Sequence, residues 1–141
     1  MKTSILLLLT LSVCCVWSVQ AQTGNVFIVQ TFKAKLPDGG TGAERDSLLM
    51  ERIENVVKKN DKILSQRHFR HYFGQDSRDW IVITEYRNFA DFEVADSLNG
   101  QLARKHWPDD KKRAEANRKL GSYFEPMHSD EVYRIVPKFT K

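Results

Sequence analysis

The sequence predicts an α+β domain in which helices cover one face of a four-stranded antiparallel sheet. Alternating apolar and polar residues mark four segments of strand length. Apolar residues at helical spacing mark the segments between them, and a polar turn over residues 74–79 joins two strands into a hairpin. The resulting order, β-α-β-β-α-α-β, is the ferredoxin-like split βαβ arrangement.

The predicted strands span residues 25–35, 63–73, 80–87 and 131–139. The third is the most apolar, so we expect it to lie centrally in the sheet. Successive side chains of a strand point to opposite faces, so Ile81 and Ile83 share one face. The opposite face of this strand carries Trp80, Val82, Thr84 and Tyr86. Pro137 cannot donate a ladder hydrogen bond, which suits an edge strand or a strand end.

Three helices are predicted, over residues 43–60, 89–105 and 108–123. In the first, Leu49, Ile53, Val56 and Val57 form the inward stripe, and we expect the charged residues, Arg45 and Arg52 among them, to point outward. The third helix is mostly polar, and Pro108 with two aspartates suits its first turn.

The first 21 residues read as a signal peptide. Lys2 precedes an apolar run over residues 5–19, and Ala21 suits a cleavage site. The run is short for a bilayer span of ~20 residues, which argues against a retained membrane anchor. Residues 22–141 then form one exported domain, in the periplasm or secreted, with no membrane association after cleavage.

Charge and cysteine content exclude several classes of function for the predicted mature domain. Residues 22–141 contain no cysteine, since Cys14 and Cys15 precede them, so disulfides and thiolate chemistry are excluded. With 21 basic and 18 acidic residues the net charge is +3, and the charges are interspersed. A nucleic-acid partner is therefore not expected, because such proteins show a basic face.

Two helices can cover only one face of the sheet, so the other needs a partner. We expect the uncovered face to be the one that carries Trp80, Val82 and Tyr86, together with Ile28 and Phe32. Left in water, it would exceed the apolar patch usual for a soluble monomer. Either the third helix or a second copy of the chain could cover it, and we favour a homodimer that forms a dimeric barrel.

The candidate ligand-binding residues lie on this same predicted face. They are His68, Arg70, Tyr72, Thr84 and Tyr86. Arginine can bind a carboxylate in a bidentate manner, and tyrosine offers an apolar wall with a polar tip. The structural alternative is that the arginines form ion pairs and the tyrosines fill the dimer interface.

One junction resembles a known family. Residues 82–92, VITEYRNFADF, resemble the strand-to-helix junction of the dimeric α/β-barrel superfamily, which includes antibiotic-biosynthesis-type monooxygenases and stress-responsive barrel proteins. The chain is also similar to small secreted Bacteroidetes proteins whose ends read like residues 128–133. The resemblance implies a homodimer with a pocket between sheet and helices.

No metal or cofactor is expected. Haem-degrading members of the superfamily carry a histidine about ten residues after the junction aromatic, where this chain has Asp96. His68 and His71 are three apart on a predicted strand and therefore face opposite sides. No catalytic residue is carried over from the family.

Three functions remain open from the sequence. The first is an exported protein that binds a small anionic or aromatic molecule without catalysis. The second is a cofactor-independent monooxygenase or isomerase. The third is a structural or interaction module, which a cavity filled by its own side chains would favour.

Overall fold

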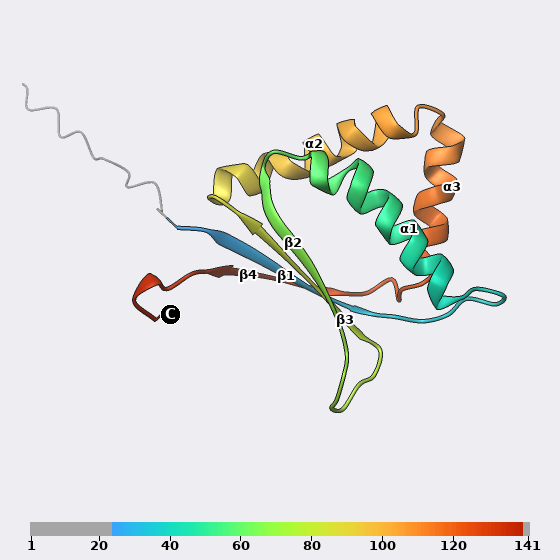
Figure 1. The fold of residues 1–141 in the computed structure, drawn as a ribbon, viewed down its shortest axis with the longest axis horizontal. Helices are drawn as coiled ribbons and strands as arrows, with labels where there is room; N and C mark the ends of the chain where they lie inside the picture. The colour runs from blue at the N-terminus through green and yellow to red at the C-terminus, as the bar shows by residue number, and fades with distance from the viewer. Residues whose placement is uncertain (1–23, 140–141) are drawn as a thin grey trace, which may run out of the picture.

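A computed structural model describes residues 24–139 of the chain (Figure 1). The helices are α1 (Gly42–Asn55), α2 (Phe89–His106) and α3 (Asp110–Gly121), with short 3-10 turns at Val57–Lys59 and Pro137–Phe139. The strands are β1 (Val26–Lys33), β2 (Ile63–Arg70), β3 (Asp79–Tyr86) and β4 (Ser129–Arg134). The predicted order of elements is confirmed, and the predicted signal peptide, residues 1–21, lies outside the described residues.

The strands form one antiparallel sheet in the order β2-β3-β1-β4. The apolar strand β3 is central, as predicted, and β4 is an edge. Among the four strands, the largest differences from the expected bounds are at the ends of two. The first is β2, which stops at Arg70, so Tyr72 and Phe73 lie in the hairpin connection, and the second is β4, which stops at Arg134, before Pro137.

Each helix begins at a side-chain cap. The hydroxyl of Thr41 accepts a hydrogen bond from the Glu44 backbone at 3.1 Å at the start of α1. Asn88 caps α2 and Asp109 caps α3 in the same way. Such caps satisfy backbone donors that have no partner within the helix. The predicted first helix ends at Asn55, and a 3-10 turn completes its predicted range.

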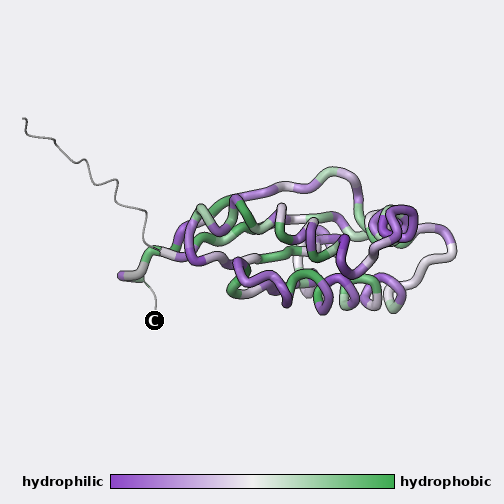
Figure 2. The backbone as a smooth tube through the Cα atoms, turned by 90° about the horizontal axis from the view of Figure 1, so that it is seen from above, coloured by the Kyte–Doolittle hydropathy of each residue, from purple (hydrophilic) through white to green (hydrophobic). Residues whose placement is uncertain are grey.

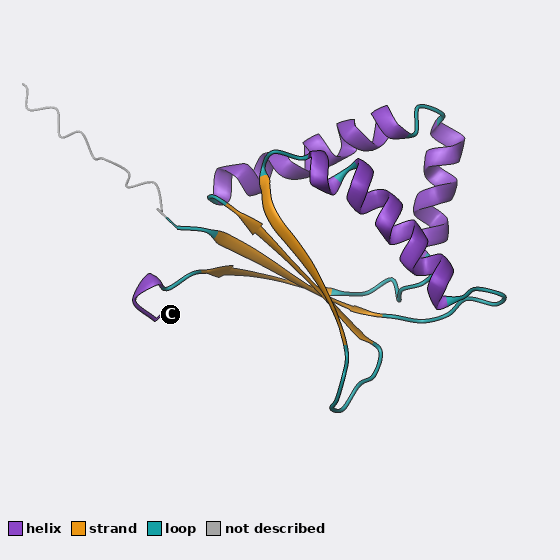
Figure 3. Ribbon diagram, in the orientation of Figure 1, coloured by secondary structure: helices purple, strands orange, loops and turns teal. Residues whose placement is uncertain are grey.

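All three helices pack on the same side of the sheet (Figure 3). They cover the face with Trp80, Val82, Thr84 and Tyr86, all buried, and Val26 and Ile28 of β1 are buried beside them. The expectation that this face is the uncovered one is therefore wrong. Both sheet faces carry apolar residues, so alternation identified the two sets without showing which one the helices take.

The open face carries the other set of alternating residues. The backbone register aligns Phe27, Val29, Ile81 and Ile83 on it, all half-buried, with Phe69 of β2 at one edge. Hydrophobic stretches of the central strands alternate with more hydrophilic ones, and α3 is mostly hydrophilic (Figure 2). The apolar surface that a single subunit leaves uncovered is thus on the side opposite to the helices.

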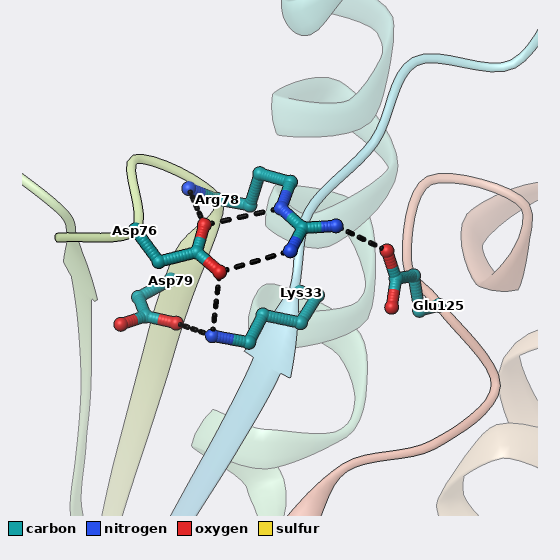
Figure 4. Close-up of polar contacts among 5 residues, drawn as sticks. All are labelled: Lys33, Asp76, Arg78, Asp79 and Glu125. Atoms are coloured by element: carbon teal, nitrogen blue, oxygen red, sulfur yellow. Dashed lines mark hydrogen bonds and ion pairs between the residues drawn. The ribbon is translucent and has the colours of Figure 1, made fainter.

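An ion network holds the β2–β3 hairpin to the rest of the sheet (Figure 4). Lys33 Nζ lies 3.0 Å from Asp76 and also contacts Asp79. Arg78 binds Asp76 at 2.9 Å and Glu125 at 2.7 Å, which ties the hairpin to the segment before β4. Hydrogen bonds from Arg78, and then from Lys33, hold the pKa of Asp76 well below its usual value.

Within residues 24–139, none of the helices has both the length and the apolar character that a membrane span requires.

Candidate functional site: a cavity between sheet and helices

A cavity of about 610 Å³ lies between the sheet and the three helices. Its floor is the helix-covered face of β1, β2 and β3, and its roof comes from α1, α2 and α3. The volume is within the range of about 300–1,000 Å³ that small-molecule sites occupy. Most of the walls are apolar, with side chains from Ile28, Phe32, Leu49, Ile53, Val57, Trp80, Val82, Phe92, Leu120 and Phe124.

A chain of hydrogen bonds crosses the floor of the cavity. The Trp80 indole Nε1 donates to His68 Nδ1 at 3.1 Å, and His68 Nε2 lies 3.1 Å from Gln66 Oε1. The Gln66 amide nitrogen then donates to Thr84 Oγ1 at 3.0 Å. These four polar groups sit side by side on β2 and β3, because Gln66 pairs with Thr84 and His68 with Val82.

This chain fixes the tautomer of His68. Indole can only donate, so His68 Nδ1 must accept, and the ring proton is on Nε2, where it donates to Gln66. Burial lowers the pKa of His68. A second ring proton would lie on Nδ1 and point at the Trp80 N–H, which disfavours the charged form of His68. His68 is therefore a neutral hydrogen-bonding group, and both its nitrogens are occupied, so it is not poised as a general base.

Trp80 is held from several sides and only 7% of it is exposed. The Arg45 guanidinium carbon lies 4.6 Å from the ring centroid, a cation–π geometry. The Phe124 ring packs edge-on at 5.9 Å, and Phe32 packs on Phe124 at 5.6 Å. These aromatic rings form one end of the cavity.

Tyr86 and Phe92 form the other end, with ring centroids 5.6 Å apart. Burial raises the pKa of Tyr86, and the nearby Asp96 carboxylate raises it further. The phenol is therefore protonated at neutral pH and can donate a hydrogen bond. Among the described residues that line the cavity, Asp96 is the only one with an acidic side chain.

Arg52, in the roof, contributes a positively charged side chain to the lining of the cavity. It extends from α1, and its Nη1 donates to Asn117 Oδ1 on α3 at 3.2 Å. Asn99 of α2 also lines the cavity, and it accepts a 2.8 Å hydrogen bond from the buried Asn60. Asn60 also donates to the backbone of Ala95, so it fixes the end of the 3-10 turn Val57–Lys59 against α2.

The structure brings three of the five predicted site residues together in the cavity: His68, Thr84 and Tyr86. It does not bring Arg70 or Tyr72 there. Arg70 is exposed at the end of β2, and Tyr72 is fully exposed in the hairpin connection. The cavity also lies where the family resemblance implied, between sheet and helices, rather than on a face covered by a second copy.

Neither arginine of α1 was among the predicted site residues. Arg45 is buried and Arg52 lines the cavity, although both were expected to point outward. A signal was present, because Arg45, Leu49, Arg52 and Val56 recur at the i, i+4, i+7, i+11 spacing of one helix face. Gln66 was also missed, although it shares a strand face with His68.

Within residues 24–139, no group of three or more histidine, cysteine, aspartate or glutamate side chains is placed to hold a metal ion. His71, His106 and His128 do not line the cavity. His106 contacts Glu51 at 3.0 Å, and His128 contacts Asp130 at 3.3 Å.

No protein-family model matches the chain, and no curated protein matches its sequence. Solved structures do match its fold. A NIPSNAP family protein from Agrobacterium tumefaciens matches at a TM-score of 0.56 and 14% identity, over 84% of this chain and 90% of its own. A proposed antibiotic biosynthesis monooxygenase from Caulobacter crescentus matches at 0.52 and 16% identity, over 81% and 92%.

A conserved protein from Methanosarcina mazei matches at a TM-score of 0.51 and 13% identity, over 79% of this chain and 93% of its own. Identities this low are informative about architecture rather than activity. The expected similarity to secreted Bacteroidetes proteins stays a prediction. The chain thus has the ferredoxin-like fold seen in proteins of the antibiotic biosynthesis monooxygenase type.

Proposed function

We propose that this chain is an exported protein that binds a small molecule in the cavity between its sheet and its helices. The observation that carries the proposal is the open volume of about 610 Å³, lined by aromatic walls and a few convergent polar groups. A structural module would fill this space with its own side chains. The buried hydrogen-bond chain on the floor supplies direction and therefore specificity.

Gly121 offers a clean test of this proposal. It lines the cavity at the end of α3, and a Cβ atom added there would meet no atom within 4 Å. We expect Gly121→Phe to fill the cavity without disturbing the fold, and Gly121→Ala to leave most of the volume open.

The measurement is native mass spectrometry of the protein purified from its own host. Wild type and Gly121→Ala should carry a bound small molecule that Gly121→Phe has lost, with circular dichroism unchanged. If Gly121→Phe retains the molecule with the same occupancy, the ligand lies elsewhere and the proposal fails.

A second candidate is a cofactor-independent oxygenase or isomerase, and Asp96 is the observation that favours it. This carboxylate lines the cavity near the Tyr86 phenol, and no ion pair or hydrogen bond joins its side chain to other described residues. It could accept a proton from a bound substrate. Asp96→Asn should then abolish turnover of the co-purified molecule while its binding persists, and equal turnover would exclude this role.

A homodimer through the open sheet face is part of the proposal. The register places Arg67, Ile83, Val29 and Glu131 in one row across that face. A two-fold axis parallel to the strands would set Arg67 of one copy over Glu131 of the other, with Ile83 over Val29. The row is therefore self-complementary in charge and apolar at its centre.

The exposed residues at the hairpin end support the same arrangement. Phe73 is 94% exposed beyond β2, at one edge of the sheet, and Met127 is 85% exposed just before β4, at the other edge. The same two-fold axis brings the hairpin of one copy toward the Met127 end of its partner. Apolar surface that each subunit leaves in water would thereby be covered.

Light scattering tests the dimer. We expect twice the monomer mass for residues 22–141, and a monomer for Ile83→Glu. Arg67→Glu should weaken association, and the charge swap Arg67→Glu/Glu131→Arg should restore it. A monomeric wild type would overturn the assembly without affecting the cavity, because the cavity is built by one subunit.

A further inference from the structure

Among the described residues that line the cavity, Arg52 is the only lysine or arginine. His68 is neutral and fully hydrogen-bonded, so it supplies no positive charge. Among the described residues, no carboxylate oxygen lies within 4.0 Å of the Arg52 guanidinium. Its side-chain hydrogen bond goes to the neutral amide of Asn117.

Two other arginines that are largely buried, unlike Arg52, form ion pairs with carboxylates. Arg45 is paired with Asp46, and Arg113 with Asp110. A guanidinium carries five N–H donors, and Arg52 uses one of them in its bond to Asn117. The remaining donors of this half-buried group have the planar geometry that binds a carboxylate through two parallel hydrogen bonds.

The rest of the cavity limits the size, polarity and charge of the remaining part of a ligand that carries this carboxylate. Aromatic rings close both ends, Trp80 with Phe124 at one and Tyr86 with Phe92 at the other. The floor runs along β1 from Ile28 to Phe32, four residue steps that cover ~13 Å. Asp96 in the lining would repel a second negative charge.

We propose that the ligand is a hydrophobic monocarboxylate, with its carboxylate on Arg52 and its apolar body between the two aromatic ends. This inference rests on the proposed binding function and specifies its ligand class. The neutral donors of the cavity, Tyr86 and Asn99, are left to bind a polar group elsewhere on the molecule.

The test uses 2-naphthoate and its neutral isostere 2-naphthamide, titrated by calorimetry into the protein at pH 7.5. Wild type should bind 2-naphthoate at least tenfold more tightly than 2-naphthamide. Arg52→Gln keeps a donor for Asn117 but removes the charge, and it should weaken 2-naphthoate at least tenfold while leaving 2-naphthamide unchanged. The matched control Arg118→Gln removes an exposed arginine of α3 and should change neither.

The outcomes separate this inference from the function on which it rests. Equal binding of both probes, with no effect of Arg52→Gln, would overturn the carboxylate assignment and leave cavity binding intact. Binding of neither probe, together with no co-purified molecule, would overturn both. Competition by octanoate against 2-naphthoate shows which kind of apolar body the cavity accepts. Displacement of 2-naphthoate indicates that the ligand is a straight-chain acid, and the absence of displacement indicates that it is an aromatic acid.

Discussion

The hydrogen bond from Trp80 to His68 gives the sharpest energetic prediction. Replacing His68 with phenylalanine keeps the bulk of the ring but removes the acceptor for the Trp80 N–H, which is 3.1 Å away. Trp80 is 7% exposed, so most of its indole group is removed from solvent. A buried donor without a partner costs about 1–3 kcal/mol, and we expect His68→Phe to lower the free energy of unfolding by that amount.

A double-mutant cycle isolates this term. In a Trp80→Phe background no indole donor remains, so His68→Phe should cost less by about 1 kcal/mol or more. The assay is urea denaturation at pH 8, where His68 is neutral in both states, at one protein concentration so that self-association is constant. His71→Phe, in the hairpin connection, is the control and should change stability by under about 0.5 kcal/mol.

Equal cost of His68→Phe in both backgrounds would refute the reasoning. The hydrogen-bond chain on the cavity floor would then contribute nothing to stability, and the assigned tautomer of His68 would lose its support.

Three further predictions concern pH, a helix and the hairpin. Burial lowers the folded pKa of His68, so the unfolded state binds more protons as pH falls from ~6.5 through that folded value. Wild type should therefore lose more stability than His68→Phe between pH 7 and 5 in urea titrations; parallel curves would contradict this. Gly100→Ala in α2 should raise the free energy of unfolding by about 0.5–1 kcal/mol, because the nearest atom to the added methyl is the flexible end of Arg104 at 3.5 Å. Lower stability would show that the helix tolerates no side chain there. Arg78→Ala breaks the contacts with Asp76 and Glu125, so amide exchange in residues 71–78 should accelerate while the unfolding midpoint changes little. Unchanged exchange would mean that the network does not hold the hairpin.

Much of the fold could be predicted from the sequence, because its signals are local. The alternation in residues 80–86 marked the central strand, and the polar turn after Gly74 marked the hairpin. Strand ends were harder to predict. The aromatic residues Tyr72 and Phe73 extend the β pattern past Arg70, but none of the described strands pairs with them.

The face of the sheet could not be predicted from alternation alone. Ile81 and Ile83 are as apolar as the set that includes Val82, so either set suits a core. The crossover from β1 through α1 to β2 decides which side the helices take, because such connections are right-handed in nearly all proteins. The outcome is a property of the assembled chain. His68, Thr84 and Tyr86 were nevertheless identified together, because alternation correctly placed them on one face.

The roof of the cavity was the least predictable part. Arg52 and Asn117 are 65 positions apart in sequence and meet only because α1 and α3 pack together. Charged residues on a helix usually face water, so the two arginines of α1 that point inward were expected to point outward.

The central claim is that the ligand lies beneath the helices of one subunit and not against the open sheet face. Its most direct test is a ¹⁵N–¹H spectrum of the protein titrated with 2-naphthoate, with the Trp80 indole signal assigned through Trp80→Phe. We expect the Trp80 Nε1–H signal to move in proportion to saturation while the backbone amides of Phe69 and Tyr133, at the edges of the open face, stay in place. Movement of those amides with a stationary Trp80 signal would contradict the claim.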